Sequence, residues 1–250
     1  MKKPIIIAVE GNIGTGKSTL LTKLKNQIGS SKIIFCQEPI DEWMKIKNKN
    51  GVTILNEFYN DPKKYSFSFQ IMILKTTNDL LQNTIKNNPQ CEMIICERSF
   101  LSSRYVFTQM LYKDGLMNDI EYQIYKDIFD TWCNNYYFPD KIIYLYSSAK
   151  ICLQRIQKRS RNGENNIGIE YLQNCNDHYR DFLVLFNGYD LPMIPILKID
   201  VENDDDIDID IESEFHFKNR FKSNVFLCSF KHWSLYLFIC IFTCWFFFSC

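Results

Sequence analysis

The chain has 250 residues, with 29 basic (Lys and Arg) and 29 acidic (Asp and Glu) side chains, so its formal net charge is zero at pH 7. That length can hold one α/β domain with a full core, and the balanced charge gives no reason to expect a nucleic acid polymer as a partner. The ten cysteines are irregularly spaced, without a C-x-x-C pair or a histidine at zinc-ligand spacing, which argues against a disulfide framework or a zinc site. We therefore expect a reducing compartment, the cytoplasm.

A phosphate-binding loop lies near the start of the chain. Residues 11–18 match the pattern G-x-x-x-x-G-K-[ST], an Ile-rich run over 4–9 precedes them as a buried strand would, and leucines follow at helical spacing. A helix should therefore open at Lys17, and the short apolar run before the loop is not a signal peptide. Inward-facing backbone N–H groups, the lysine and the Ser18 hydroxyl together suit the phosphates of ATP and a Mg²⁺ ion. The predicted nucleotide-binding residues are Gly11, Asn12, Ile13, Gly14, Thr15, Gly16, Lys17, Ser18 and Thr19.

The next two predicted strands both end in charged residues. Residues 32–37 lead into Glu38-Pro39, and residues 91–96 are followed at once by Glu97-Arg98-Ser99. Side chains at the carboxyl ends of strands in an open α/β sheet lie where ligands bind. Taken alone, however, Glu38 is better explained as a solvated acid in a loop.

A long helical pattern over 52–87, with a break near Asp61-Pro62, lies between these two strands. Its aromatic stripe is more typical of a core than of a binding site. Gln70 is the exception, because an amide among apolar neighbours needs hydrogen-bond partners if it is buried.

Strands and helices continue to alternate along the second half of the chain. The predicted helices cover 103–112, 119–134, 149–158 and 172–186, and the predicted strands cover 140–146 and part of 193–200. Pro195 suggests that the last strand lies at an edge of the sheet. The alternation predicts an α/β fold with a five-stranded parallel sheet and helices on both faces.

A basic cluster ends the helix predicted over 149–158. Arg155, Lys158, Arg159 and Arg161 lie within seven positions and repel one another unless an anion joins them. Because a phosphate-binding loop is also present, we expect a short Arg-rich lid that closes on a triphosphate. A solvated face and a nonspecific nucleic-acid patch are the alternatives.

The end of the chain differs in composition from the P-loop domain expected over 1–201. Residues 202–214 form an acidic low-complexity stretch, which is expected to be a solvated linker. Residues 215–250 are first basic and then apolar, and the last 18 carry no charge, which is the lower limit for crossing a bilayer. A membrane anchor, a core or dimer helix, and a frame or splicing error in the gene model are three open explanations.

Together these motifs resemble the deoxyribonucleoside kinase family, which includes deoxycytidine, deoxyguanosine and mitochondrial thymidine kinases. The resemblance runs from about Ile5 to Val201 and implies a P-loop kinase fold. Its motifs are residues 11–19, Glu38-Pro39 with Trp43, Phe67-Ser68-Phe69-Gln70, Glu97-Arg98-Ser99 with Arg104-Tyr105, and residues 155–164. It implies an enzyme that uses ATP and Mg²⁺ to phosphorylate the 5′-hydroxyl of deoxyribonucleosides in salvage, usually as a homodimer.

The resemblance also implies a role for each matching residue. Glu38 matches the general base for the 5′-hydroxyl, Arg98 the arginine beside that base, and Lys17 the phosphate-binding lysine. The implied metal ligands are Ser18 and Glu97. The implied nucleoside-binding residues, besides Glu38 and Arg98, are Trp43, Leu55, Phe58, Phe69, Gln70, Ser103 and Phe107 around the base, and Tyr59 and Glu164 at the sugar 3′-hydroxyl. The implied lid arginines are Arg155, Arg159 and Arg161.

Two positions bear on the choice of nucleoside. The deoxycytidine and deoxyguanosine kinases carry an Arg and an Asp over the base, where this chain has Thr77 and Ser103. The neutral pair implies a preference for pyrimidines, thymidine or deoxycytidine, or broad specificity. Residues 201–206 match the adenine-side loop, whereas the apolar tail does not resemble the helix that usually ends the family's chains.

Three other functions are alternatives. A nucleoside monophosphate kinase such as thymidylate kinase shares the loop, sheet and lid, but its phosphate acceptor needs a cation rather than Glu38. A nucleotide-binding switch would carry an N-K-x-D motif after the third strand, and no such stretch is present there. An inactive membrane-tethered scaffold would be expected to have lost Lys17, Glu38 or Arg98, and all three are present.

Overall fold

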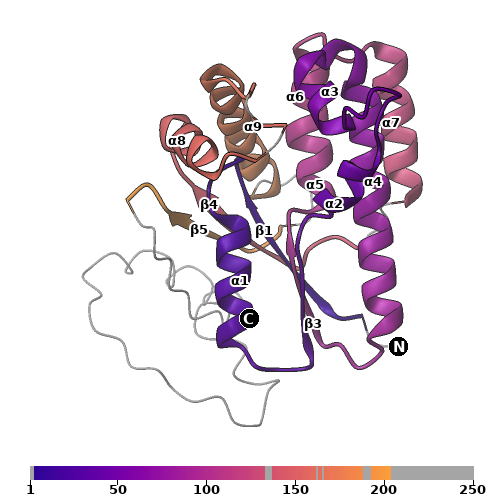
Figure 1. The fold of residues 1–250 in the computed structure, drawn as a ribbon. Helices are drawn as coiled ribbons and strands as arrows, with labels where there is room; N and C mark the ends of the chain where they lie inside the picture. The colour runs from indigo at the N-terminus through magenta and orange to yellow at the C-terminus, as the bar shows by residue number, and fades with distance from the viewer. Residues whose placement is uncertain (1–2, 133–136, 162, 165, 188–192, 204–250) are drawn as a thin grey trace, which may run out of the picture. The chain divides into compact units, whose positions relative to one another are not determined.

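The computed structural model describes residues 3–132, 137–161, 163–164, 166–187 and 193–203. The strands within these residues are β1 (Ile5–Gly11), β2 (Ile33–Cys36), β3 (Met93–Glu97), β4 (Lys141–Tyr146) and β5 (Ile196–Asp200). They form one parallel sheet in the order β2-β3-β1-β4-β5 (Figure 1). The predicted five-stranded parallel sheet is therefore confirmed.

Burial explains why these stretches become strands. The four residues from Ile6 to Val9 in β1 are at most 1% exposed, as expected for the central strand of a sheet that is covered on both faces. β5 lies at the edge next to β4, as Pro195 indicated, and the Pro195 carbonyl accepts a hydrogen bond from the Ile142 N–H at 2.9 Å. A proline costs least at an edge, because its missing N–H is not needed there.

Helices surround the sheet. They are α1 (Lys17–Gln27), α2 (Ile40–Lys45), α3 (Ile54–Asn60), α4 (Pro62–Asn87), α5 (Phe100–Ser102), the π-helix η1 (Ser103–Thr108), α6 (Gln109–Lys113), α7 (Asp119–Trp132), α8 (Ala149–Arg159) and α9 (Ile169–Asn187). Figure 1 shows α4 beside α7 and α8 beside α9. The helix predicted from 119 to 134 reaches at least Trp132, and its last predicted residues lie outside the described part of the chain.

The predicted break at Asp61-Pro62 is confirmed, and its chemistry is local. The Asp61 N–H donates to the Glu57 carbonyl at the end of α3, and the Asp61 carboxylate accepts from the Lys64 N–H at the start of α4. Pro62 occupies the first turn of α4, where its missing N–H has no helical acceptor. One aspartate thus ends one helix and begins the next.

Two elements differ from the sequence-based expectation. The short helix α2 was not predicted, although it buries Trp43. The helix expected over 103–112 is not a regular α-helix, because it begins as the wider π-helix η1. Such wide turns are rare and often occur at functional sites, which agrees with the position of η1 beside the pocket described below.

The cysteines of the described residues, Cys36, Cys91, Cys96, Cys152 and Cys175, are free and buried. A free cysteine in such a position behaves as a small apolar side chain. In the same residues no helix is both long and apolar enough to cross a membrane. The acidic stretch from 204 and the apolar tail to 250 lie outside the described residues.

Candidate active site

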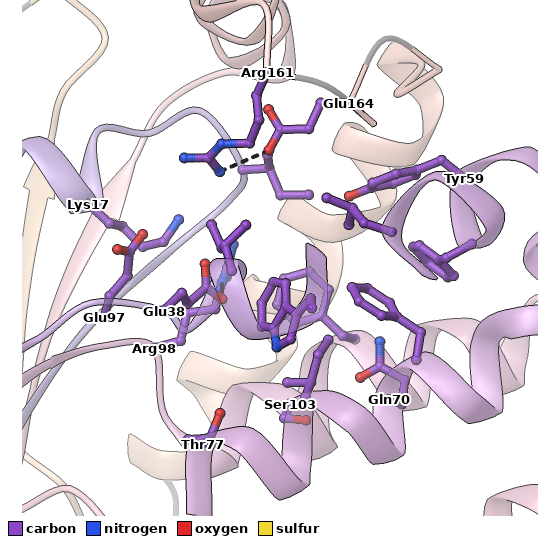
Figure 2. Close-up of a pocket in the computed structure, with 18 of the residues that line it drawn as sticks. Lys17, Glu38, Tyr59, Gln70, Thr77, Glu97, Arg98, Ser103, Arg161 and Glu164 are labelled. Carbon is purple, nitrogen blue, oxygen red and sulfur yellow. Dashed lines mark hydrogen bonds and ion pairs between the residues drawn. The ribbon is translucent and has the colours of Figure 1, made fainter. Parts of the chain in front are cut away.

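A pocket lies where the phosphate-binding loop, the carboxyl ends of β2 and β3, and the lid meet (Figure 2). All the residues that the resemblance assigned to the nucleoside line it: Glu38, Trp43, Leu55, Phe58, Tyr59, Phe69, Gln70, Arg98, Ser103, Phe107 and Glu164. Ile13, Gly14 and Lys17 of the loop and Arg159 and Arg161 of the lid line it as well. The fold therefore brings the predicted donor and acceptor residues to one cavity.

The phosphate-binding loop has the backbone that its glycines make possible. Gly11 and Gly14 have φ values of 144° and 86°, and a Cβ atom at either position would lie 2.5 Å from a carbonyl oxygen, of Leu145 and Cys152 respectively. No side chain caps the first turn of α1, so its N–H groups are available for an anion. The loop is thus packed closely against β4 and α8 and is open toward a phosphate.

Lys17 is buried beside this loop, and its Nζ atom donates to the Asn12 carbonyl at 2.8 Å. Burial, followed by the charge of Arg98, lowers its pKa to about 8. A triphosphate would bring the negative charge that stabilises the protonated lysine. The Asn12 side chain serves the fold instead, since it donates to the Leu172 carbonyl and to Asn176 Oδ1 of α9, both at 2.7 Å.

Glu38 and Arg98 form an ion pair at the centre of the pocket. Arg98 Nε lies 2.7 Å from Glu38 Oε1, and both side chains are less than one-fifth exposed. The Arg98 backbone is in the left-handed region, with φ of 64°, a conformation rarely adopted by residues other than glycine. Burial raises the pKa of Glu38 above its ordinary value, against the opposing charge of Arg98, which is the direction that suits a general base.

A hydroxyl and a carboxylate meet beneath this pair. The Ser18 hydroxyl, in the first turn of α1, donates to Glu97 Oε1 at 2.8 Å. Oxygen ligands of this kind suit Mg²⁺, which usually keeps several waters and is bound through one or two protein groups plus the phosphates of its substrate. The described residues contain no cluster of three or more His, Cys, Asp or Glu side chains that would form a metal site without a substrate.

Aromatic rings line the end of the pocket that the resemblance assigns to the nucleoside. Trp43 and Phe69 meet edge to face, with ring centroids 5.5 Å apart, and Phe58 packs on Phe69 at 4.8 Å. Trp43 Nε1 donates to the Thr76 hydroxyl at 2.9 Å, which fixes the indole. These rings make an apolar slot of the kind that a flat aromatic base would contact.

One amide lies at the inner end of this slot. Gln70 is 2% exposed, and its Oε1 atom accepts from the Thr108 hydroxyl at 3.3 Å. Thr77 and Ser103 line the same pocket, with Ser103 between Thr77 and Gln70 in the view of Figure 2, and the Ser103 hydroxyl is 2.8 Å from the Tyr125 hydroxyl. The three polar side chains Gln70, Thr77 and Ser103 are all neutral.

The lid arginines are held by a glutamate. Glu164 is 6% exposed, and its two carboxylate oxygens bind Arg159 at 2.5 Å and Arg161 at 3.1 Å. Arg155, the third predicted lid arginine, is not among the residues that line the pocket, because its guanidinium donates to the Val201 carbonyl at 2.8 Å. Two of the three predicted lid cations thus face the pocket.

Sequence reasoning did not identify two tyrosines of α9. Tyr171 lines the pocket, and the Tyr179 hydroxyl accepts a hydrogen bond from the Arg98 guanidinium at 2.6 Å. Tyr171 lies just before the predicted start of that helix, at 172. Tyr179 lies within a helix whose apolar pattern indicates only core, so its polar contact had no local signal.

Comparisons with known proteins agree with this geometry. The chain matches the deoxynucleoside kinase family over residues 7–226. It is 32% identical to human deoxycytidine kinase over 222 residues, which cover 79% of this chain and 84% of that enzyme. It is 31% identical to a probable deoxycytidine kinase of fowlpox virus, over 79% of each chain, and 29% identical to human mitochondrial thymidine kinase 2, over 81% of this chain and 72% of that one. This protein is a kinase, and it belongs to the deoxynucleoside kinase family.

Proposed function

We propose that this kinase transfers the γ-phosphoryl group of ATP to the 5′-hydroxyl of a deoxyribonucleoside, with Glu38 as the general base. The observation that carries the proposal is the Glu38–Arg98 pair, which lies between the phosphate-binding loop and a slot of aromatic rings. A nucleoside in the slot would present its 5′-hydroxyl to Glu38 and to the phosphate held by the loop. Phosphoryl transfer needs mainly such alignment, with one acceptor for the hydroxyl proton.

The donor side combines charge from three elements. Lys17 and the N-terminus of α1 would bind the phosphates, and Arg159 and Arg161 would turn toward them from the lid. Arg155, which holds the end of β5 in this structure, would remain near the adenine side of ATP. Ser18 and Glu97 would hold Mg²⁺, which neutralises phosphate charge when it is bound.

The acceptor side favours a neutral alcohol over a phosphate. Glu38 and Glu164 both line the pocket. Among the described residues that line it, Arg98 is the one cation outside the loop and the lid, and it is already paired with Glu38. A nucleoside monophosphate would bring two negative charges to this carboxylate-lined end, which like-charge repulsion disfavours. The alternative of a monophosphate kinase is therefore the weaker one.

The neutral polar groups around the base position suggest which nucleosides are accepted. Thr77 and Ser103 are small and neutral, and they add no charge that would select one base. We therefore propose thymidine and deoxycytidine as the main substrates, or a broad specificity that includes them. Two of the related proteins are named for deoxycytidine and one for thymidine.

The remaining proposals concern the localisation and oligomeric state of the protein and the segments that follow the kinase domain. We propose a cytoplasmic homodimer with a kinase domain over 1–201, an acidic linker over 202–214, and a tail over 215–250 that is either a membrane anchor or an artefact of the gene model. Sedimentation with liposomes, for the full chain and for a form that ends near residue 210, would test whether the tail binds a membrane. Only the full chain should sediment with liposomes if the tail is an anchor.

The proposed activity is tested by a panel of acceptors. The full chain, ATP and Mg²⁺ are incubated with each of the four common deoxyribonucleosides and, separately, with their 5′-monophosphates, and the products are separated by chromatography. We expect phosphorylation of thymidine or deoxycytidine and none of the monophosphates. Phosphorylation of monophosphates alone would overturn the proposal, and efficient use of purine deoxynucleosides alone would overturn the substrate preference.

A further inference from the structure

A buried acid lies directly before the phosphate-binding loop. Glu10, in β1, is 0% exposed, and both of its carboxylate oxygens are occupied. Oε1 accepts from the Ser99 hydroxyl at 2.6 Å, and Oε2 accepts from the Tyr179 hydroxyl at 3.1 Å. Nothing in the proposed reaction uses this carboxylate, although burying one costs far more free energy than an apolar side chain would.

The Tyr179 hydroxyl connects this acid to Arg98. It accepts from the Arg98 guanidinium at 2.6 Å, and its single proton is then directed to Glu10. Burial raises the pKa of Tyr179 well above its ordinary value, so the hydroxyl keeps that proton. A chain of hydrogen bonds therefore runs from Arg98 through Tyr179 to Glu10.

Arg98 has particular need of such support. Its backbone has the unfavourable φ of 64°, and its guanidinium lies 4.6 Å from the Phe107 ring centroid, a cation–π contact that does not set the rotation of the guanidinium over the ring. The nitrogen that binds Tyr179 also donates to the Gly11 carbonyl at 2.9 Å, and Nε on the same guanidinium binds Glu38. Because the guanidinium is planar and rigid, holding one nitrogen determines the direction of the other.

We propose that Glu10 and Tyr179 are positioning residues for phosphoryl transfer: they hold the Arg98 guanidinium in the orientation that directs the Glu38 carboxylate to the 5′-hydroxyl. This inference rests on the proposed function, since it concerns the same reaction. The geometry agrees with it, because the guanidinium lies between two acidic side chains that it reaches by different nitrogens, Glu38 directly and Glu10 through a hydroxyl. Charged hydrogen-bond donors and acceptors give such a chain its direction.

The test is a double-mutant cycle of Tyr179→Phe and Glu10→Gln in the full chain. Both variants keep the shape of the residue, and the Tyr179 ring stays packed between Phe107 and Phe182. Tyr144→Phe is the matched control, because Tyr144 is also buried, its ring lies 5.5 Å from that of Tyr179, and none of the side-chain hydrogen bonds found in the described residues joins it to Arg98 or to Glu10, its partner in the register of β1 and β4. Turnover at saturating ATP and nucleoside, the KM for each substrate, and the melting temperature are measured for every protein.

We expect each single variant to lower kcat about tenfold, as for the loss of one charge-assisted hydrogen bond at a catalytic group, with little change in the KM for ATP. If Glu10 acts through Tyr179, the double variant should be no slower than Tyr179→Phe alone. Tyr144→Phe should turn over like the unaltered enzyme.

Three results would overturn the inference. They are an unchanged kcat in Tyr179→Phe, effects of the two single variants that multiply in the double variant, or an equal loss in Tyr144→Phe. If Glu10→Gln does not fold, the comparison of kcat between Tyr179→Phe and Tyr144→Phe becomes the deciding measurement. An unaltered enzyme that phosphorylates no nucleoside would instead contradict the proposed function, so the two failures are distinguishable.

Discussion

Arg98 Nε lies 2.7 Å from Glu38 Oε1, and the backbone of Arg98 has a φ of 64°. The end of β3 is thus held in an unfavourable conformation that brings a guanidinium to the carboxylate at the end of β2. Strain of this kind is typical of sites where orientation matters more than stability. We therefore expect this pair to make the reaction depend on pH.

The pH dependence of the reaction should reflect Glu38. Burial raises the pKa of Glu38, and the charges of Arg98 and Lys17 oppose that rise. A general base works only when ionised, so kcat/KM for the nucleoside should fall as the pH falls through this raised pKa, above the ordinary carboxyl range of about 4 to 4.5. In Arg98→Met the opposing charge is gone, and the acidic limb should move to still higher pH. Rate profiles for both proteins check this, and an acidic limb in the ordinary carboxyl range for the unaltered enzyme would contradict it.

Glu164 should couple the sugar to the lid. Both of its oxygens bind lid arginines in this structure, and the same carboxylate is proposed to accept the sugar 3′-hydroxyl. Loss of one hydrogen bond to a charged group costs roughly tenfold or more in kcat/KM, so 2′,3′-dideoxynucleosides should be poorer substrates by that factor. In Glu164→Gln, kcat/KM for a deoxynucleoside and for its 2′,3′-dideoxy analogue should differ much less, because the carboxylate charge that distinguishes them is missing. Equal discrimination in the two proteins would show that Glu164 does not bind the sugar.

The base preference should change when charge is placed over the base. Thr77 and Ser103 line the pocket with neutral groups. Thr77→Arg combined with Ser103→Asp would fill that space with an ion pair, and kcat/KM for thymidine should then fall at least about tenfold while deoxycytidine is still used. The control is the neutral pair Thr77→Val with Ser103→Ala, which should keep thymidine as a substrate. If the charged pair leaves thymidine use unchanged, these positions do not select the base.

Much of the fold was predictable because its signals are local. The residues of β1 are buried on both faces and therefore read as a continuous apolar run, and Asp61-Pro62 ends one helix and begins the next through contacts within a few positions. The phosphate-binding loop has fixed spacing, because its backbone conformation requires glycine at defined places such as Gly14. Elements of this kind depend little on distant parts of the chain.

What could not be predicted depends on distant contacts or on short segments. Helix α2 has too few residues to show a helical period, and the wide turns of η1 have no sequence signature of their own. The contact of Tyr179 with Glu10 joins residues 169 positions apart, so neither residue suggests it alone. Arg155 looked like a third cation for the phosphates, but in this structure the Val201 carbonyl binds it.

The central claim is that Glu38 takes the proton from a nucleoside hydroxyl, and turnover of Glu38→Gln tests it most directly. The measurement is steady-state phosphorylation of thymidine or deoxycytidine, whichever the unaltered enzyme uses faster, together with nucleoside affinity by calorimetry. Glutamine keeps the shape of the side chain and can still bind Arg98 through its amide oxygen. We predict that kcat falls on the order of 10²-fold or more while nucleoside binding remains, as for loss of a positioned base. Turnover close to that of the unaltered enzyme would contradict the account.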